Sequence, residues 1–184
     1  MKRYQKILLL IVVLISAFIL SGFLLPAQYQ VKRSIIIQAS DTAIFQQINS
    51  MRNWKNWIAW NEKKDPTAQY YFRGPEFGVG SQMEWQGREV GQGIITIKSS
   101  TPNKSVQYDL LLEQGSFKGF GSLSITAEQK GYRLTWQDQG NLGNNPLFRW
   151  AGFLFMDSML GSAFEEGLHR LKTKLENSPS SAQE

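Results

Sequence analysis

Apolar side chains mark one long helical pattern near the end of the chain, from Pro146 to Glu176. They recur at steps of three and four residues and therefore share one helix face: Phe153, Met156, Leu160, Phe164, Leu168, Leu171 and Leu175. Pro146 suits a helix start, and Ser162 with Glu165 has the form of a capping box just after Gly161. We therefore expect a long C-terminal helix with a kink near Gly161, or a short helix followed by a longer one.

The middle of the chain has a different period, in which apolar and polar side chains alternate as in strands with one wet face. Gly and Pro turn signals separate these stretches. The predicted strands are residues 69–73, 79–86, 90–99, 104–113, 117–128 and 132–139. Gly91 and Gly93 lie near the start of one strand as possible bulges.

The region before these strands predicts one more strand and two short helices. A β-branched stretch at 29–38 reads as a strand, and Ala39-Ser40-Asp41 is a helix-start signal for residues 41–50. A second short helix follows within 51–60, where Trp54 and Trp57 are three apart and share a face. The sequence thus predicts an α+β domain: a curved antiparallel sheet of about seven strands wrapped around the long C-terminal helix.

Residues 7–25 carry no charge and predict a membrane-spanning helix. At 1.5 Å per residue they span about 28 Å, close to the ~30 Å hydrocarbon core of a bilayer. A cleaved signal peptide is the alternative, but its apolar region is usually shorter and no clear cleavage site follows. Lys2, Arg3 and Lys6 precede the run and favour a cytoplasmic N-terminus, although Lys32 and Arg33 beyond it weaken that assignment.

We therefore expect three parts: a single-pass anchor over 1–27 in the cytoplasmic (inner) membrane, a domain over 28–177 on the outer, periplasmic side, and a disordered tail over 178–184. The net charge of +5 includes three positive charges in the N-terminal flank. From Gln28 onward there are 17 basic and 15 acidic residues, a difference of +2. That balance excludes the electrostatic footprint of a nucleic-acid binder.

Catalytic and metal-binding patterns are weak in this sequence. The chain has no cysteine and one histidine, His169, on the exposed side of a charged helical segment, so no Ser-His-Asp set or metal cluster is predicted. Gly78-Val79-Gly80 and Gly119-Phe120-Gly121 lack the strand–loop–helix context of a phosphate loop, and a bulge or tight turn is the better interpretation. We assign no catalytic residue, metal or cofactor.

Three acidic residues remain as possible cavity groups. Glu84 or Asp138 could be a buried acid with a raised pKa. The strand alternation instead places Glu84 on the outer face, where a solvated carboxylate is favoured. Asp157 lies beside the apolar helix stripe and either turns inward or caps a loop.

The order of elements resembles the helix-grip fold of the START-like superfamily (SRPBCC). The local sequence is similar to its polyketide cyclase/dehydrase and lipid-transport branch, in the version with an N-terminal membrane segment. The resemblance is carried by residues 31–40, 48–57, 74–85 and 155–172. It implies a deep apolar cavity between the sheet and the long helix. It implies no particular reaction, because one fold hosts many functions.

The resemblance turns a set of apolar residues, otherwise read as core, into cavity candidates: Met83, Trp85, Tyr108, Leu110, Leu123, Ile125, Trp136, Phe155, Met156, Met159 and Phe164. Tyr108 adds a polar tip to such a wall. Trp54 and Trp57 are candidates for the cavity mouth or the membrane interface, with plain packing as the alternative.

The leading hypothesis is a membrane-tethered, non-catalytic carrier or sensor of an apolar small molecule or lipid. One alternative is an enzyme of the cyclase or hydratase type, with Tyr108 or a buried acid assisting. Another is a protein-interaction module at the membrane that uses the outer sheet face or the helix end.

Overall fold

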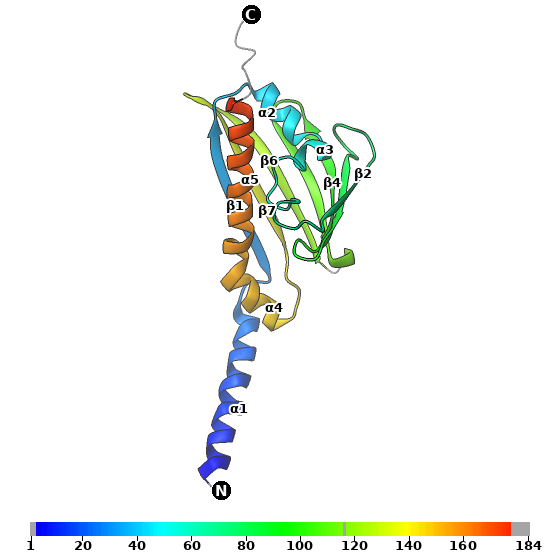
Figure 1. Ribbon diagram of the computed structural model, residues 1–184. Helices are drawn as coiled ribbons and strands as arrows, with labels where there is room; N and C mark the ends of the chain where they lie inside the picture. Colours follow the sequence, from blue (N-terminus) through cyan, green and yellow to red (C-terminus); the bar gives the residue numbers. More distant parts are fainter. Residues whose placement is uncertain (1–2, 116, 178–184) are drawn as a thin grey trace, which may run out of the picture.

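The computed structural model describes residues 3–115 and 117–177 (Figure 1). Its helical elements are α1 (Arg3–Ser21), η1 (Gly22–Leu24), α2 (Asp41–Ile48), α3 (Met51–Trp54), η2 (Glu113–Gly115), α4 (Pro146–Ala151), η3 (Gly152–Met156) and α5 (Asp157–Asn177). Its strands are β1 (Gln28–Ile37), β2 (Gln69–Arg73), β3 (Gln82–Gln86), β4 (Gln92–Thr101), β5 (Ser105–Leu112), β6 (Phe117–Glu128) and β7 (Gly131–Asn141).

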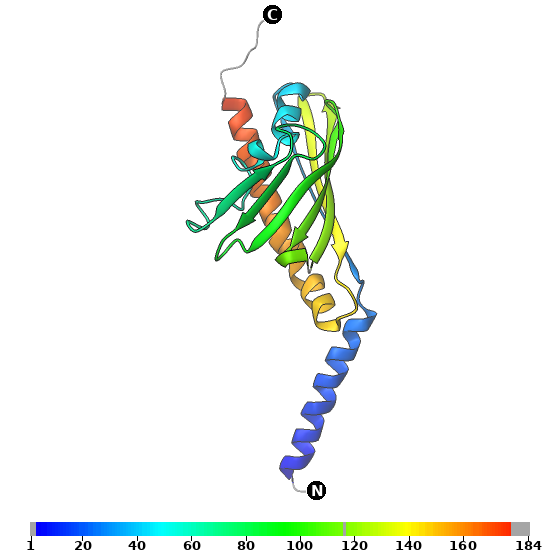
Figure 2. The ribbon, with the colours of Figure 1, turned by 90° about the vertical axis from the view of Figure 1, so that its right-hand side faces the viewer.

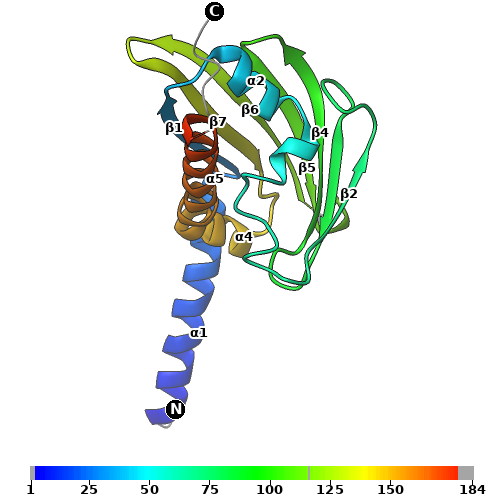
Figure 3. The same ribbon diagram turned by 45° about the horizontal axis from the view of Figure 1, so that its top comes forward.

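The strands form one antiparallel sheet in the order β1-β7-β6-β5-β4-β3-β2. The first strand pairs with the last, which places the N-terminal and C-terminal parts of the domain side by side. Figure 3 shows the sheet curving around α5, with α2 and α3 near the end of α5 that is distant from α1. This arrangement confirms the α+β fold and the helix-grip architecture.

Strand positions follow the predicted alternation, with differences at a few ends. β2 and β6 have the predicted bounds. β3 begins at Gln82 instead of residue 79, because Gly78 and Gly80 take positive φ angles in a tight turn. Gly93 lies in regular pairing, and the register shift in β4 falls between Ile97 and Ser99 instead.

A cluster of aromatic rings joins the sheet to α5. Phe164 of α5 lies flat on Trp136 of β7, with ring centroids 4.1 Å apart and planes at 10°. Trp54 and Trp57 pack edge-on against Trp136 at 5.6 and 5.4 Å. All four side chains are buried, so the middle of the space between sheet and helix is filled by rings.

The predicted short helix followed by a longer one is present as α4 and α5, but the break between them lies earlier in the chain than predicted. The kink expected near Gly161 is wrong, because α5 continues through this residue and Ser162 donates its hydroxyl hydrogen to the carbonyl of Ser158 instead of capping a new helix. The irregularity is the wider π turn of η3. A π turn shifts the register of a helix face, and Phe153 of the predicted stripe is exposed.

Gly161 serves the contact between α5 and β1. A side chain there would overlap the guanidinium of Arg33. Arg33 donates from Nε to Glu165 at 2.6 Å and from Nη1 and Nη2 to the two carboxylate oxygens of Asp157 at 3.0 Å each. Asp157 therefore turns to neither the core nor a loop; it is an exposed partner of Arg33.

The N-terminal helix extends away from the domain at the end where α4 lies (Figure 2). Residues Arg3–Leu24 are long and apolar enough to cross a membrane, a property that a signal sequence shares. Which side of a membrane the domain occupies stays a prediction, and the predicted tail at 178–184 lies outside the described residues.

Replacing Phe164 with alanine should lower the free energy of unfolding by about 3–5 kcal/mol, because the change opens a cavity beside Trp136. The matched control, Phe155→Ala at an exposed position of η3, should change it by less than ~0.5 kcal/mol. Urea unfolding of the full chain in mild detergent, followed by tryptophan fluorescence, measures both. Equal losses would contradict the assignment of Phe164 as the central contact of α5.

Candidate functional site: a buried carboxyl cluster and the recess beside it

One acidic side chain lies on the inner face of the sheet. Asp138 of β7 is 1% exposed. One carboxyl oxygen accepts a hydrogen bond from the Tyr29 hydroxyl at 2.6 Å, and the other accepts one from the Tyr108 hydroxyl at 2.8 Å. The indole N–H of Trp136 donates to the Tyr108 oxygen at 2.8 Å. We call Asp138, Tyr29, Tyr108 and Trp136 the carboxyl cluster.

Glycine residues of the sheet, which have no side chain, leave room for the two tyrosine rings. Tyr108 pairs across β5 and β6 with Gly121, where a Cβ atom would overlap the phenol ring. Tyr29 pairs across β1 and β7 with Gly140, where a Cβ would lie 2.6 Å from Tyr29 Cε1. Gly119 and Gly121 lie in unbroken register with both neighbouring strands. The predicted bulge or turn is therefore wrong for this pair, whereas Gly78 and Gly80 do form a turn.

Burial controls the charge of the carboxyl cluster. It raises the pKa of Asp138 to about 6, although the hydrogen bonds from Tyr29 and Tyr108 act in the opposite direction. Burial and the nearby Asp138 carboxyl raise the pKa of both tyrosines above the usual value of 10.0. The tyrosines are thus neutral donors at physiological pH, and Asp138 changes its charge slightly below neutrality.

A recess of about 180 Å³ opens between the edge strand β1 and the π turn of η3. Its lining residues are Pro26, Gln28, Tyr29, Gln30, Val31, Leu142, Gly152, Phe153, Met156 and Asp157. Tyr29 belongs to both this wall and the carboxyl cluster. We call this space the β1–η3 recess. Its wall is mostly apolar, and its polar side chains besides Tyr29 are those of Gln28 and Gln30 on β1 and of Asp157 at the start of α5.

The structure distributes the predicted cavity residues over three environments. Buried in the core are Met83, Trp85, Tyr108, Leu110, Leu123, Trp136 and Phe164. Ile125 and Met156 are partly buried, and Met156 lines the β1–η3 recess. Phe155 and Met159 are 62% exposed and point away from the core.

Trp54 and Trp57 lie in the centre of the core and not at a cavity mouth. Trp54 donates its indole N–H to the carbonyl of Ile48 at 2.8 Å. The indole N–H of Trp57 is buried and has no hydrogen-bond partner among the described residues. An unpaired buried donor costs about 1–3 kcal/mol, so this position suits a buried water or another polar atom.

Glu84 and Asp138, the two candidates for a buried acid, lie in different environments. Glu84 lies on the outer face, as the alternation predicts, and pairs with Arg73 at 3.3 Å. Asp138, in contrast, is the buried acid. His169 is exposed. Within residues 3–115 and 117–177, no three His, Asp or Glu side chains gather in a group that could hold a metal ion.

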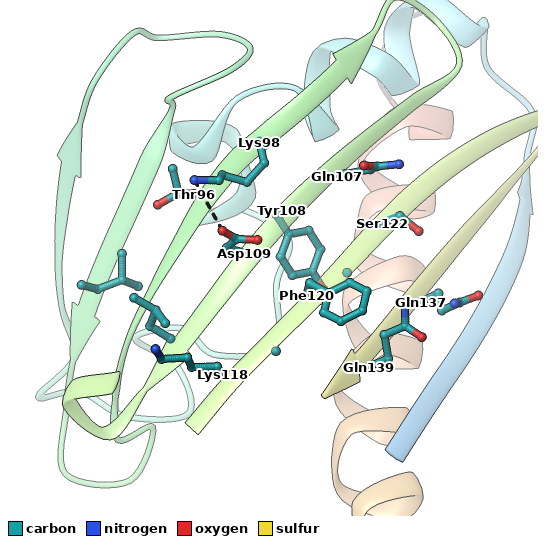
Figure 4. Close-up of a pocket in the computed structure, with 14 residues that line it drawn as sticks. Thr96, Lys98, Gln107, Tyr108, Asp109, Lys118, Phe120, Ser122, Gln137 and Gln139 are labelled. Carbon is teal, nitrogen blue, oxygen red and sulfur yellow. Dashed lines mark ion pairs between the residues drawn. The ribbon is translucent and has the colours of Figure 1, made fainter. Parts of the chain in front are cut away.

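The outer face of the sheet has its own groove, of about 580 Å³ (Figure 4). Tyr108 of the carboxyl cluster is among the labelled lining residues. The others labelled around the groove are Thr96, Lys98, Gln107, Asp109, Lys118, Phe120, Ser122, Gln137 and Gln139, with an ion pair of 3.4 Å between Lys98 and Asp109. These polar side chains form the wet face that the alternation predicts. Phe120 is the large apolar exception among them.

Sequence reasoning missed Tyr29 and the glycines beneath it. Tyr29 lies at the start of β1, and its partners on β6 and β7 are distant in sequence. A signal is nevertheless present. Gly119 and Gly121 fall at the inward positions of a strand that continues with Leu123 and Ile125, and glycine at such positions marks the close approach of another group.

The model of the family described as polyketide cyclase / dehydrase and lipid transport matches residues 28–176. The chain belongs to this family. No curated protein matches it.

Among solved structures, the family member resembles the di-domain ARO/CYC StfQ from the steffimycin biosynthetic pathway, with a TM-score of 0.60 and 10% identity over 82% of this chain and 51% of StfQ. It also resembles the Aha1 dimer from Colwellia psychrerythraea (TM-score 0.56, 16% identity, 83% of this chain and 99% of that one). Protein CV1439 from Chromobacterium violaceum is similar as well (TM-score 0.57, 11% identity, 82% and 99%). At these identities the likenesses show the fold alone.

The raised pKa of Asp138 predicts a specific pH dependence of stability. The folded-state pKa of about 6 lies above the ordinary value of 3.8, so the folded protein holds the proton more tightly than the unfolded chain. The stabilisation is complete below pH ~4 and is lost as the pH rises through ~6, by up to about 3 kcal/mol. Urea unfolding from pH 4 to 7 should show this decline relative to Asp138→Asn, which cannot ionise; parallel curves would contradict the buried acid.

The close contact between Tyr108 and Gly121 predicts that Gly121→Val is strongly destabilising, by about 2 kcal/mol or more, because overpacking forces the ring and backbone apart. Ser122→Val is the matched control, since it adds the same side chain to the neighbouring, outward-facing position. Valine suits a strand, so the control should be near neutral. Thermal unfolding followed by circular dichroism compares them, and a similar loss in both variants would show that strand propensity, not the Tyr108 contact, is measured.

Proposed function

We propose that the protein is a membrane-tethered member of this family that binds an apolar small molecule, or the apolar part of a lipid, in the β1–η3 recess without catalysing a reaction. The observation that carries the proposal is the position of the recess. It lies between sheet and helix at the end of the domain from which α1 extends, and Pro26, directly after the apolar N-terminal run, is part of its wall.

The wall has the chemistry of a binding site for apolar groups. Val31, Leu142, Phe153 and Met156 contribute apolar side chains, and Met suits an adaptable wall because its chain is unbranched and polarizable. Tyr29 places a phenol in the same wall, with its hydroxyl hydrogen held by Asp138. Such a combination, mostly apolar with one fixed polar group, is typical of small-molecule sites.

The recess has room for part of a ligand. Its volume of about 180 Å³ is similar to that of an engineered protein cavity of roughly 150 Å³ that binds benzene. One ring, or a few methylene groups, fits inside. The rest of a larger ligand must remain outside the wall.

The titratable groups favour binding over catalysis. Among the lining residues only Tyr29 and Asp157 titrate. The pKa of Tyr29 is raised, which makes its phenol a poor proton donor. Hydrogen bonds from Arg33 lower the pKa of Asp157, so its carboxylate is a weak base and carries no proton to donate at neutral pH. Asp138 lies behind Tyr29. An acid–base pair facing the recess, which a cyclase or hydratase mechanism of this kind requires, is therefore not formed by these groups.

A photoactivatable fatty acid that carries a diazirine near its chain end tests the proposal on the full chain in phosphatidylcholine vesicles. We expect adducts on Val31 and Leu142, located by peptide mass spectrometry and competed by excess unlabelled fatty acid. Met156→Trp fills the recess and should weaken labelling about tenfold, since excluding two methylene groups costs ~1.6 kcal/mol. Thr173→Trp, on the exposed far end of α5, should leave labelling unchanged.

Two results would reject the proposal. Labelling of Val31 and Leu142 that is absent, or that does not compete, would remove the binding site. Equal labelling in the Met156→Trp and wild-type proteins would place the ligand outside the recess.

A further inference from the structure

The joint between α1 and the domain is tight. Trp150 of α4 stacks on Phe18 of α1, with ring centroids 4.7 Å apart, and its indole N–H donates to the Phe18 carbonyl at 3.0 Å. Gly22 lies against Pro146, where a Cβ atom would be 2.8 Å from the Pro146 Cβ and 2.9 Å from a Trp150 ring carbon. Only glycine allows this approach, so α4 is held directly against the end of α1.

Arg149 adds polar contacts to the same joint. Its guanidinium donates to the carbonyls of Phe23 at 3.2 Å and Leu25 at 3.4 Å, where the helical part of the N-terminal segment ends. It also donates to the carbonyl of Gly143 at 3.0 Å. The one charged side chain of α4 and η3 thus satisfies backbone groups of the joint and does not project freely.

This joint fixes the depth of α4 relative to the apolar run. Phe18 lies seven residues before Leu25, the last residue of the apolar run 7–25, which is about 10 Å along a helix at 1.5 Å per residue. If residues 7–25 span a bilayer, then Trp150 lies beside a residue within the span. Trp is common at membrane–water interfaces because its ring is apolar and its N–H is polar.

An exposed apolar face continues from this joint along α4, η3 and the start of α5. It comprises Leu147, Phe148, Phe153, Leu154, Phe155 and Met159, each between 51% and 63% exposed. From Pro146 to Met156 the sequence contains no acidic residue, and Arg149 is its one basic residue. Six large apolar side chains on a few helical turns form a patch of the kind that marks a partner or a membrane. We call it the α4 apolar face.

We infer that the α4 apolar face is inserted into the leaflet of the bilayer on the domain side, and that its partner is the lipid surface. The depth of Trp150 carries this choice, because the face begins where α4 touches the spanning segment. Helices that lie in the interface bury an apolar face at the boundary of headgroups and acyl chains. The face here is short, but α1 holds it in place, so its own membrane affinity need not be large.

The inference rests on the proposed function and adds a route to it. Phe153 belongs to both the α4 apolar face and the wall of the β1–η3 recess. Insertion of the face brings the recess to the level of the lipid chains. An apolar group then enters the recess from the bilayer without crossing water, which identifies the ligand class as molecules already dissolved in the membrane.

Single-cysteine labelling tests the insertion, because the chain contains no native cysteine. Leu154→Cys reports on the face, Val13→Cys on α1, and Thr173→Cys on the exposed far end of α5. Phe148→Cys gives a second reading of the face. Each full-length variant carries an environment-sensitive fluorophore in phosphatidylcholine vesicles. Quenching is measured with nitroxide-labelled acyl chains and, separately, with aqueous iodide.

We expect labels at Leu154 and Phe148 to be quenched several-fold more by the nitroxide lipids than the label at Thr173, and less by iodide. One contrary result is a label at Val13 that the nitroxide lipids quench while iodide quenches the label at Leu154 as strongly as the label at Thr173. This result would overturn the insertion of the face and leave the membrane tether intact. A label at Val13 that iodide reaches would overturn the tether and the proposed function with it. Protection of Leu154 from both quenchers would overturn lipid contact in favour of a protein that covers the face.

Discussion

Stacking of Phe164 on Trp136 is the contact on which the rest of the domain depends. It fixes α5 against β7 at 4.1 Å, and the same Trp136 donates to Tyr108 in the carboxyl cluster. One residue therefore connects the apolar core to the buried polar groups. With Trp54 and Trp57 packed around it, the centre of the helix-grip fold is closed. Space remains where the chain leaves regular geometry, at the π turn of η3.

The two ends of α5 are attached to the sheet by different means. Towards its C-terminus, Leu168 and Leu171 are buried among the core residues. Towards its N-terminus, α5 is attached to β1 by the ion pairs of Arg33 with Asp157 and Glu165. These pairs are partly exposed, so each contributes little to stability, but they define the distance between β1 and the helix. The β1–η3 recess lies directly beside them and owes its width to that distance.

Features that depend on one element were predictable from the sequence. The alternation in β5 and β7 and the stripe of Leu160, Phe164 and Leu168 follow from the period of a single strand or helix, and these residues are buried as expected. The structural role of Gly161, as the point where α5 contacts Arg33, was not predictable in this way. Its neighbour is Arg33, from the other end of the domain, and the capping pattern of the next residues has the same form whether or not a helix ends there.

The candidate site shows the same limit more clearly. Tyr108 and Asp138 stood out separately, as a polar tip and a possible buried acid. Their hydrogen bond depends on the register of β5, β6 and β7, and the place of Tyr29 depends on pairing between the first and last strands. The deep cavity implied by the family resemblance does not occupy the centre of this fold, because tryptophan rings fill that space. A pattern of residue types predicts the inward face of a strand but not how much of the interior its neighbours use.

Within the proposed function, the size of the recess also bears on the choice between a carrier and a sensor. A carrier must shield its ligand from water, and sites that do so bury most of the surface of the ligand in pockets of roughly 300–1,000 Å³. About 180 Å³ beside Tyr29 and Met156 holds one ring or a short piece of chain. In the proposed arrangement the remainder stays in lipid, where it needs no shielding.

Moving an apolar group from lipid to protein gains little from the hydrophobic effect, since both surroundings are apolar. Selectivity must then come from the shape of the wall around Phe153 and from the fixed phenol of Tyr29. Those properties favour a sensor that samples molecules in the membrane over a carrier that removes them from it.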